Sequence, residues 1–180
     1  MKKIALLILG GLISLQVFSQ STEKNVLKFN PLSLILSTGT VFYERKIDDF
    51  QSLQLGVSYT GIKIDDLKYQ GIIITPEYRR YLKGNALSGT YFAPYLRYQR
   101  FNLTNTDSKS EATFSSIGGG LLIGRQWIYD SGISLDIFAG PSYSSGSFEY
   151  KDGGSSSDFD TNWGVEGFGI RVGLAVGFGL

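Results

Sequence analysis

The sequence predicts an all-β protein, specifically an eight-stranded antiparallel up-and-down transmembrane β-barrel, and three observations lead to this prediction. Apolar residues recur at every second position in segment after segment, which is the spacing of a strand with one apolar face. After residue 21, no window is apolar for the roughly 18 residues that a membrane helix needs, and none repeats apolar residues with a helical period. Turn signals divide the chain into eight such segments, and bacterial membrane barrels have an even number of strands.

The first twenty residues differ in character from the rest of the chain. A basic start, Met1 to Lys3, is followed by the apolar run Ile4 to Leu15, which polar residues close before it is long enough to span a bilayer comfortably. This pattern is typical of a secretory signal peptide, so we expect residues 1–20 to be a signal peptide and residues 21–180 to form the barrel domain. A permanent single-pass anchor is the alternative.

The alternation is clearest in the third and the last predicted strands. Within residues 51–60, Leu53, Leu55 and Val57 fall on one face, and polar or small residues fall on the other. The segment from Val172 to Leu180 repeats the pattern, with glycine and alanine opposite the larger apolar residues. The predicted strands are, in chain order, residues 26–36, 39–47, 51–60, 69–82, 90–102, 112–128, 133–149 and 162–180.

The connections between these strands alternate in length. Three are compact (residues 48–50, 83–89 and 129–132), and three are longer and more polar (residues 61–68, 103–111 and 150–161). Short turns at one end and longer loops at the other are typical of an outer-membrane barrel whose termini lie on the short-turn, periplasmic side. We expect the longer loops to carry any binding specificity of the protein.

The composition of the two strand faces predicts which face points outward. The polar faces are rich in glycine, serine, threonine and glutamine but poor in lysine and glutamate, which is an unsuitable coat for a soluble protein. Aromatic residues gather near strand ends, as aromatic girdles at the two bilayer interfaces require. The expected girdle consists of Tyr43, Tyr59, Tyr81, Tyr91, Tyr98, Trp127, Tyr143 and Trp163. A soluble exported barrel that encloses an apolar ligand makes the opposite assignment and is the alternative.

If the apolar faces contact lipid, charged residues must point into the barrel. The interior of eight strands is just wide enough for side chains to fill, and buried charges persist when they are paired. We therefore expect an interior charge network that acts as a structural plug, with a gated pore as the alternative. Its expected members are the acids Glu44, Glu77 and Asp136 and the bases Lys46, Arg79, Arg97 and Arg171.

The composition excludes several classes of function. The chain has no cysteine and no histidine, which removes the usual zinc sites, thiol nucleophiles and histidine-based acid–base catalysis. Seventeen basic and sixteen acidic residues are too balanced for an electrostatic nucleic-acid binder. We expect no catalytic residues, no metal site and no cofactor; a lipid-modifying barrel enzyme is the weaker alternative.

Four short motifs carry a resemblance to a known family. They are Asn30 to Leu34, Tyr43 to Lys46, Pro76 to Tyr81 and Ala93 to Tyr98. With these motifs the chain resembles small, largely uncharacterised outer-membrane barrel proteins with the eight-stranded architecture of OmpA and OmpX. The resemblance implies location in the bacterial outer membrane, contact with its lipid and insertion by the outer-membrane assembly machinery. The motifs are short and mark the barrel more than any activity. From the strand pattern and the composition, we expect a protein without enzymatic activity that has a structural role or a surface-binding or adhesive role through its loops.

Overall fold

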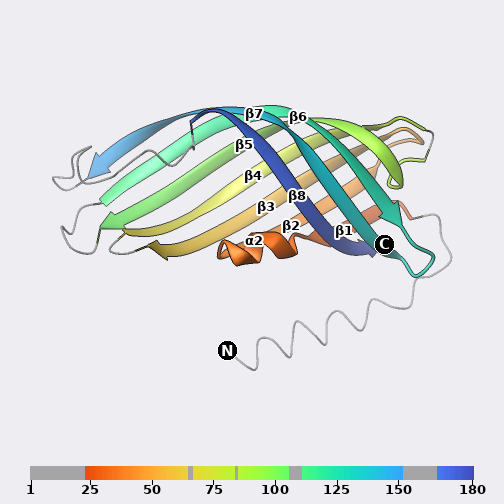
Figure 1. Cartoon of the computed structure of the whole chain (residues 1–180), viewed down its shortest axis with the longest axis horizontal. Helices are drawn as coiled ribbons and strands as arrows, with labels where there is room; N and C mark the ends of the chain where they lie inside the picture. Colours follow the sequence, from red (N-terminus) through yellow and green to blue (C-terminus); the bar gives the residue numbers. More distant parts are fainter. Residues whose placement is uncertain (1–22, 65–66, 84, 106–110, 152–165) are drawn as a thin grey trace, which may run out of the picture.

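The computed structural model describes residues 23–64, 67–83, 85–105, 111–151 and 166–180. The predicted all-β architecture is confirmed: eight antiparallel strands form a closed barrel in which each strand pairs with its neighbours in the sequence (Figure 1). The predicted signal peptide, residues 1–20, lies outside the described residues. The strands and the helix are β1 (Asn25–Phe29), α2 (Pro31–Ile35), β2 (Thr38–Lys46), β3 (Gln51–Ile64), β4 (Leu67–Tyr81), β5 (Gly89–Asn105), β6 (Glu111–Ile128), β7 (Ile133–Lys151) and β8 (Gly167–Gly179).

The strands reach further than predicted at one end of the barrel. The segment 61–68, predicted as a loop, continues the β3–β4 ladder from Gly61↔Gln70 to Ile64↔Leu67. Likewise, β5 extends to Asn105 and β6 begins at Glu111, so every described residue of the predicted loop 103–111 is strand; residues 106–110 lie outside the described residues. Most of the third predicted loop, 150–161, lies outside the described residues. We call this end the loop end, and the opposite end, with connections 47–50, 82–88 and 129–132, the turn end.

The first predicted strand, 26–36, is wrong in its second half. The strand stops at Phe29, and Asn30 caps a short helix by accepting hydrogen bonds from the backbone N–H groups of Leu32 (2.9 Å) and Ser33 (3.2 Å). Pro31 occupies the first turn, where its missing N–H leaves no bond unmade. The local sequence Asn-Pro-Leu-Ser therefore begins a helix where the apolar alternation alone indicated a strand.

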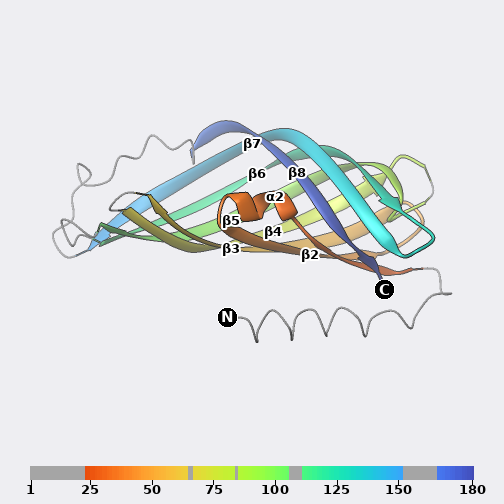
Figure 2. The same cartoon turned by 60° about the horizontal axis from the view of Figure 1, so that its bottom comes forward.

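Helix α2 interrupts the wall of the barrel. Because β1 ends at Phe29, it pairs with β8 through four residues, from Val26↔Gly179 to Phe29↔Val176. Beyond that point α2 lies against β2 and β8, in the place that a longer β1 would occupy (Figure 2). The helix makes its own backbone hydrogen bonds, so it can fill the gap without the partners that a strand requires.

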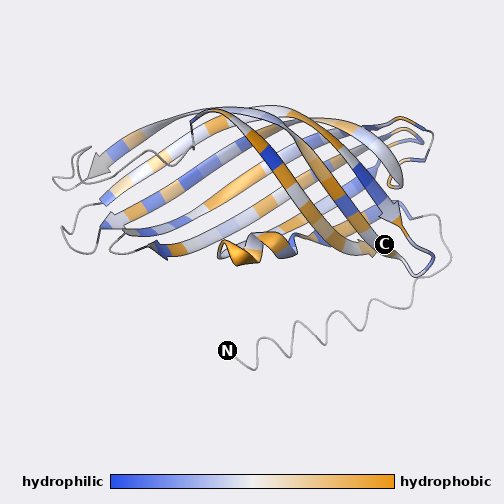
Figure 3. Cartoon of the chain, in the orientation of Figure 1, coloured by the Kyte–Doolittle hydropathy of each residue, from blue (hydrophilic) through white to orange (hydrophobic). Residues whose placement is uncertain are grey.

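Buried and exposed residues alternate along the strands, as the sequence predicts. Figure 3 shows hydrophobic and hydrophilic positions following one another along the ribbons. Outward residues from most strands are large, apolar and exposed: Leu27, Phe29, Val41, Leu53, Leu55, Val57, Ile72, Ile74, Leu96, Ile117, Leu121, Ile123, Ile137, Ile170 and Val172. Outward charges such as Arg45, Arg80 and Arg100 lie toward the strand ends. In the described part of the chain, no helix is both long and apolar enough to cross a membrane.

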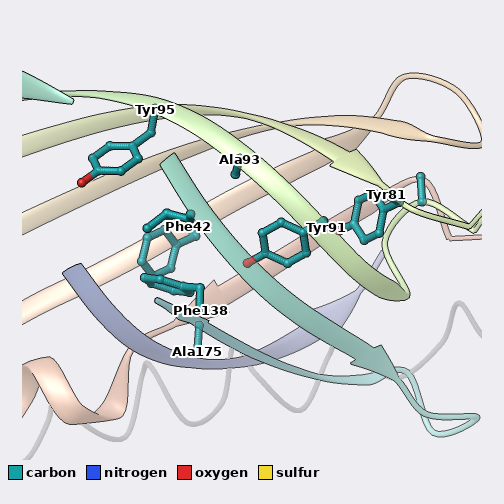
Figure 4. Packing of buried hydrophobic residues seen from close by; sticks show 9 residues of the cluster. Phe42, Tyr81, Tyr91, Ala93, Tyr95, Phe138 and Ala175 are labelled. Atoms are coloured by element: carbon teal, nitrogen blue, oxygen red, sulfur yellow. The ribbon is translucent and has the colours of Figure 1, made fainter. Parts of the chain in front are cut away.

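Several inward aromatic rings lie over glycines on the neighbouring strand. Phe42 is paired with Gly56, and Phe138 with Gly173, in ladder positions where a Cβ on the glycine would collide with the ring. The two phenylalanines meet edge to face, with ring centroids 6.4 Å apart (Figure 4). The missing side chains therefore make the space that the rings occupy inside a narrow barrel.

The connection between β4 and β5 closes the turn end. Ala86 and Leu87 are 5% and 2% exposed, although they belong to a connection. The amide nitrogen of Gln126 donates a 2.8 Å hydrogen bond to the carbonyl of Leu87, which ties this connection to β6. The barrel interior is thus covered by chain at the end where the predicted periplasmic turns lie.

Candidate functional site

A cluster of buried charges lies inside the barrel near the turn end, and Lys28 on β1 is at its centre. Its Nζ donates hydrogen bonds to Glu44 Oε2 (2.6 Å), Gln126 Oε1 (2.5 Å) and Asp136 Oδ2 (3.0 Å). These partners come from β2, β6 and β7, and all four residues have exposures of 1% or less. An ammonium group with three oxygen acceptors uses all three of its donor hydrogens.

Arg79 on β4 is the second cation of this group. Its Nη1 donates to Asp136 Oδ2 (2.7 Å) and lies 3.3 Å from Glu44 Oε2, while Nη2 donates to Glu77 Oε2 (3.1 Å). Its side chain has no exposed surface. We call Lys28, Glu44, Glu77, Arg79 and Asp136 the ion-pair cluster. Its carboxylates are too close together to stay charged without these two cations.

Hydroxyl groups satisfy the remaining oxygens of Glu44 and Asp136. Glu44 Oε1 accepts from Ser52 (2.5 Å) and Tyr81 (2.8 Å), and Asp136 Oδ1 accepts from Tyr91 (2.7 Å). The guanidinium of Arg79 also lies over the Tyr91 ring, 4.3 Å from its centroid. Both oxygens of Glu44 and of Asp136 are therefore hydrogen-bonded, as buried carboxylates require.

A second group of charges lies further toward the loop end. Arg171 Nη2 on β8 is 2.8 Å from Glu77 Oε1, an ion pair whose angles are not those of a hydrogen bond. The Arg171 guanidinium also lies over the ring of Tyr95, 4.5 Å from its centroid. Arg97 on β5 is within range of electrostatic repulsion from Arg171. We call Arg97 and Arg171 the arginine pair.

The arginine pair is incompletely partnered. Arg97 makes no ion pair or hydrogen bond with any residue that the structure describes, and its Nε is buried without an acceptor. Arg171 Nη1 and the Tyr95 hydroxyl are buried as well, and neither has a hydrogen-bond partner among the described residues. Three unused donors thus occur within one small region of the interior.

The structure brings most of the predicted network together, but it places two members differently. Glu44, Glu77, Arg79 and Asp136 meet in the ion-pair cluster, and Arg171 reaches it through Glu77. Lys46 does not join them. It binds Asp49 in the following turn (2.8 Å), and this ammonium holds the pKa of Asp49 below its usual value. Lys46 lies at the last residue of β2, where the exposed turn is nearer than the interior carboxylates.

Arg97 is the second predicted base that does not form the expected pair. It points inward, as its alternation with outward Leu96 and Tyr98 predicts, but none of the described carboxylates lies within ion-pair distance. The remaining inward acids are already occupied by Lys28, Arg79 and Arg171.

Two members of the predicted aromatic girdle lie inside the barrel instead. Tyr81 and Tyr91 are 1% and 0% exposed, because each has the same strand parity as the inward charges and its hydroxyl binds a carboxylate. Figure 4 shows both rings among the buried side chains. The outward members are Tyr43, Tyr59, Tyr98 and Tyr143, which are exposed, and Trp127, which is half-buried beneath Arg125. Trp163 lies outside the described residues.

Several members of this interior were not predicted from the sequence, among them Lys28, Gln126 and Tyr91. Lys28 alternates with outward Leu27 and Phe29, and Gln126 and Tyr91 also lie on inward faces, so parity alone was a usable signal. Their meeting across the barrel depends on the stagger of the strands, which no single strand reveals.

The chemistry of this interior is electrostatic. Within the described ranges, no group of three acidic residues has the arrangement of a metal site. The ion-pair cluster is a buried set of charges in which every carboxylate has a cation as partner, whereas the arginine pair offers unused donors to an anion.

A family model described as "Protein of unknown function (DUF3575)" matches residues 5–178, and the chain therefore belongs to this family. No curated protein and no solved structure matches the chain. The family description assigns no activity.

Proposed function

We propose that this member of the DUF3575 family is an integral outer-membrane β-barrel without enzymatic activity, with a structural or surface-binding role. The observation that carries the proposal is the distribution of side chains across the wall. Leu53, Leu55 and Val57 point outward with exposures of 42–53%, while the five residues of the ion-pair cluster are buried inside. Lipid is the solvent in which apolar outside and charged inside is the favourable arrangement.

The ends of the wall support the same proposal. Outward basic residues lie at both ends of the apolar surface: Arg45 and Arg80 near the turn end, and Lys63, Lys68 and Arg100 near the loop end. This is where lipid headgroups and water meet a membrane barrel, and long basic side chains are favoured there. Helix α2 also fits, because its backbone is hydrogen-bonded and Leu34 and Ile35 are exposed on its surface.

The alternatives fit these observations less well. A soluble barrel that carries an apolar ligand needs an apolar interior, but the interior here holds seven charged side chains, Lys28, Glu44, Glu77, Arg79, Arg97, Asp136 and Arg171. A lipid-modifying enzyme needs an exposed acid or base, but Glu44 and Asp136 are buried and fully engaged. The plugged turn end also favours a structural barrel over an open pore.

A substitution at Leu55 tests the proposal. Leu55→Arg places a charge in the middle of the outward apolar surface, where a bilayer penalises it by about 2–4 kcal/mol. Ile47→Arg is the matched control, because Ile47 is equally exposed but lies in a turn. In water both changes are harmless, so equal stability of the two variants in lipid vesicles would contradict the proposal.

Gel mobility with and without boiling gives the first measurement. We expect the mature chain, folded in detergent, to resist SDS and to shift its mobility on heating, with a β-type circular dichroism spectrum. A chain that stays dissolved without detergent and shows no shift would instead favour the soluble alternative.

The partners of such a protein follow from its location. We propose outer-membrane lipid as its surroundings and the outer-membrane assembly machinery as its partner during insertion. Any surface ligand would bind at the loop end, where the hairpin of β3 and β4 and the strands β5 and β6 extend beyond the short β1.

A further inference from the structure

The charges inside the barrel do not balance. The ion-pair cluster contains two cations, Lys28 and Arg79, and three carboxylates, so it has a surplus of one negative charge. Arg171 neutralises this surplus through Glu77. Arg97 makes no ion pair with any described residue, although Glu77 attracts it from a longer distance, so these charged groups add up to one positive charge in excess. A largely buried guanidinium without a partner is costly, and proteins ordinarily pair or ligate such a group.

The unused hydrogen-bond donors occur at this same place. Arg97 Nε, Arg171 Nη1 and the Tyr95 hydroxyl are all buried without acceptors. Tyr95 and Arg97 lie two residues apart on the inward face of β5, and Arg171 contacts the Tyr95 ring. The nearby carboxylate oxygen Glu77 Oε1 is 2.8 Å from Arg171 Nη2, and it leaves Arg171 Nη1 and Arg97 Nε unused. Donors from two neighbouring guanidinium groups and a hydroxyl form the kind of surroundings that bind an oxyanion.

We propose that Arg97, Arg171 and Tyr95 form an anion-binding site inside the barrel and that its ligand is a monovalent carboxylate. One negative charge restores neutrality, whereas a dianion such as phosphate would create a new surplus. A planar carboxylate also matches the parallel N–H donors of a guanidinium group, and its second oxygen can accept from the tyrosine hydroxyl.

The site is within reach of solvent, although the turn end is closed. The side chain of Arg171 keeps 11% of its surface exposed, while those of the ion-pair cluster keep none. On β8, Gly169 lies next to Arg171 on the same side of the strand and is exposed, because β1 does not extend this far. The ligand is therefore either a small free carboxylate or the head of an acyl chain that reaches the interior beside β8.

Thermal unfolding of the full mature chain in neutral detergent, with sodium acetate as the probe, tests this site. Acetate should raise the unfolding midpoint of the wild-type protein, because a ligand that binds the folded state stabilises it. In Arg97→Gln the half-saturating acetate concentration should rise by about tenfold or more, as expected for the loss of a charge-assisted contact. Lys46→Gln is the control, because it removes the same charge from outside the site.

Tyr95→Phe is a second variant that removes a single unpartnered hydroxyl and leaves all charges in place. It should weaken the acetate response without lowering stability in acetate-free buffer. The proposal would be overturned if acetate had the same effect on the wild type, Arg97→Gln and Tyr95→Phe. Acetate would then act as a general salt, and the arginine pair would bind water and no anion. No response of the wild type would overturn it as well.

Octanoate, used below its micelle concentration, distinguishes the two sources of the carboxylate. Much tighter binding of octanoate than of acetate, with the same dependence on Arg97, supports an acyl-chain ligand. Equal binding supports a small free carboxylate. The test does not require a membrane location, so its failure leaves the proposed function standing.

Discussion

The two groups of charges inside the barrel have similar residues but different degrees of completion. In the ion-pair cluster, Arg79 contacts three carboxylates and has no exposed surface. A few residues further toward the loop end, Arg97 has no acceptor among the described residues. A buried charge with all its partners holds strands together, whereas one without partners costs stability unless something else binds it. The comparison indicates that the ion-pair cluster stabilises the barrel, whereas the arginine pair is available to a ligand.

The largest expected effect comes from breaking the complete group. Arg79→Gln leaves Lys28 as the cation of Glu44 and Asp136 and Arg171 as the cation of Glu77, and the free energy of unfolding should fall by about 3–5 kcal/mol. Arg80→Gln is the matched control, because the neighbouring side chain points outward and is exposed. Urea unfolding of both variants in detergent measures the difference. Equal midpoints would show that the cluster does not stabilise the barrel.

The next effect concerns the aromatic layer between the two groups. Phe42 and Phe138 lie one inward position further toward the loop end than Glu44 and Asp136, and a Cβ at Gly173 would collide with the Phe138 ring. Gly173→Ala should therefore cost about 1–3 kcal/mol of overpacking. Gly169→Ala on the same strand has one moderately close neighbour, Ser142 Oγ at 3.2 Å, and should be far milder in the same unfolding assay. A similar loss in both variants would contradict the packing argument.

A smaller effect, with the opposite sign, is expected at the incomplete group. Arg97→Gln removes a buried charge that lacks a partner, so in buffer without carboxylate its stability should rise by about 1 kcal/mol. Comparison with Arg79→Gln sharpens the contrast, because the same chemical change should destabilise one site and not the other. A loss of stability at Arg97 as large as that at Arg79 would show that Arg97 has a partner of its own.

The smallest effect is expected at Lys46, outside both groups. Its partner Asp49 is 75% exposed, and ion pairs that reach solvent in this way contribute little. Because Lys46 lowers the pKa of Asp49 from 3.8, its contribution is present above that pH and is lost as the pH falls through the lowered value. Lys46→Gln should remove this weak acid dependence from the unfolding midpoint and change little near neutral pH. A large decrease in the unfolding midpoint of Lys46→Gln at neutral pH would contradict this placement and indicate that Lys46 belongs to the interior charge network.

Strand parity explains what was predictable from the sequence. Alternation along β4 places Glu77 and Arg79 inside and Tyr78 partly outside, and it identified most charged residues that face the interior. The same rule applies to Tyr81, but its position near a strand end favoured an aromatic girdle instead. Strand parity, and not position along the strand, determines the side on which Tyr81 lies, because its hydroxyl donates a hydrogen bond to Glu44 inside the barrel.

Two features depend on information that alternation does not contain. The pairing of Lys28 with Asp136 joins residues 108 positions apart and is set by the stagger of the closed barrel. The end of β1 at Phe29 depends on local capping by Asn30, which competes with an apolar pattern that favours a strand. The first feature required the structure, whereas the second was visible in the Asn-Pro pair.

The short contact between β1 and β8 has a consequence for how the barrel assembles. These strands share four ladder pairs, whereas β1 and β2 share five and β7 and β8 share twelve. Closure of the ring is therefore the step that forms the fewest backbone contacts between strands. Lys28 lies on β1, but its amine binds groups from β2, β6 and β7. A chain with every hairpin formed and the ring still open cannot complete these bonds. We therefore expect the burial of Lys28 to keep β1 and β8 together. The lifetime of the closed barrel should then depend on the contact between these two strands.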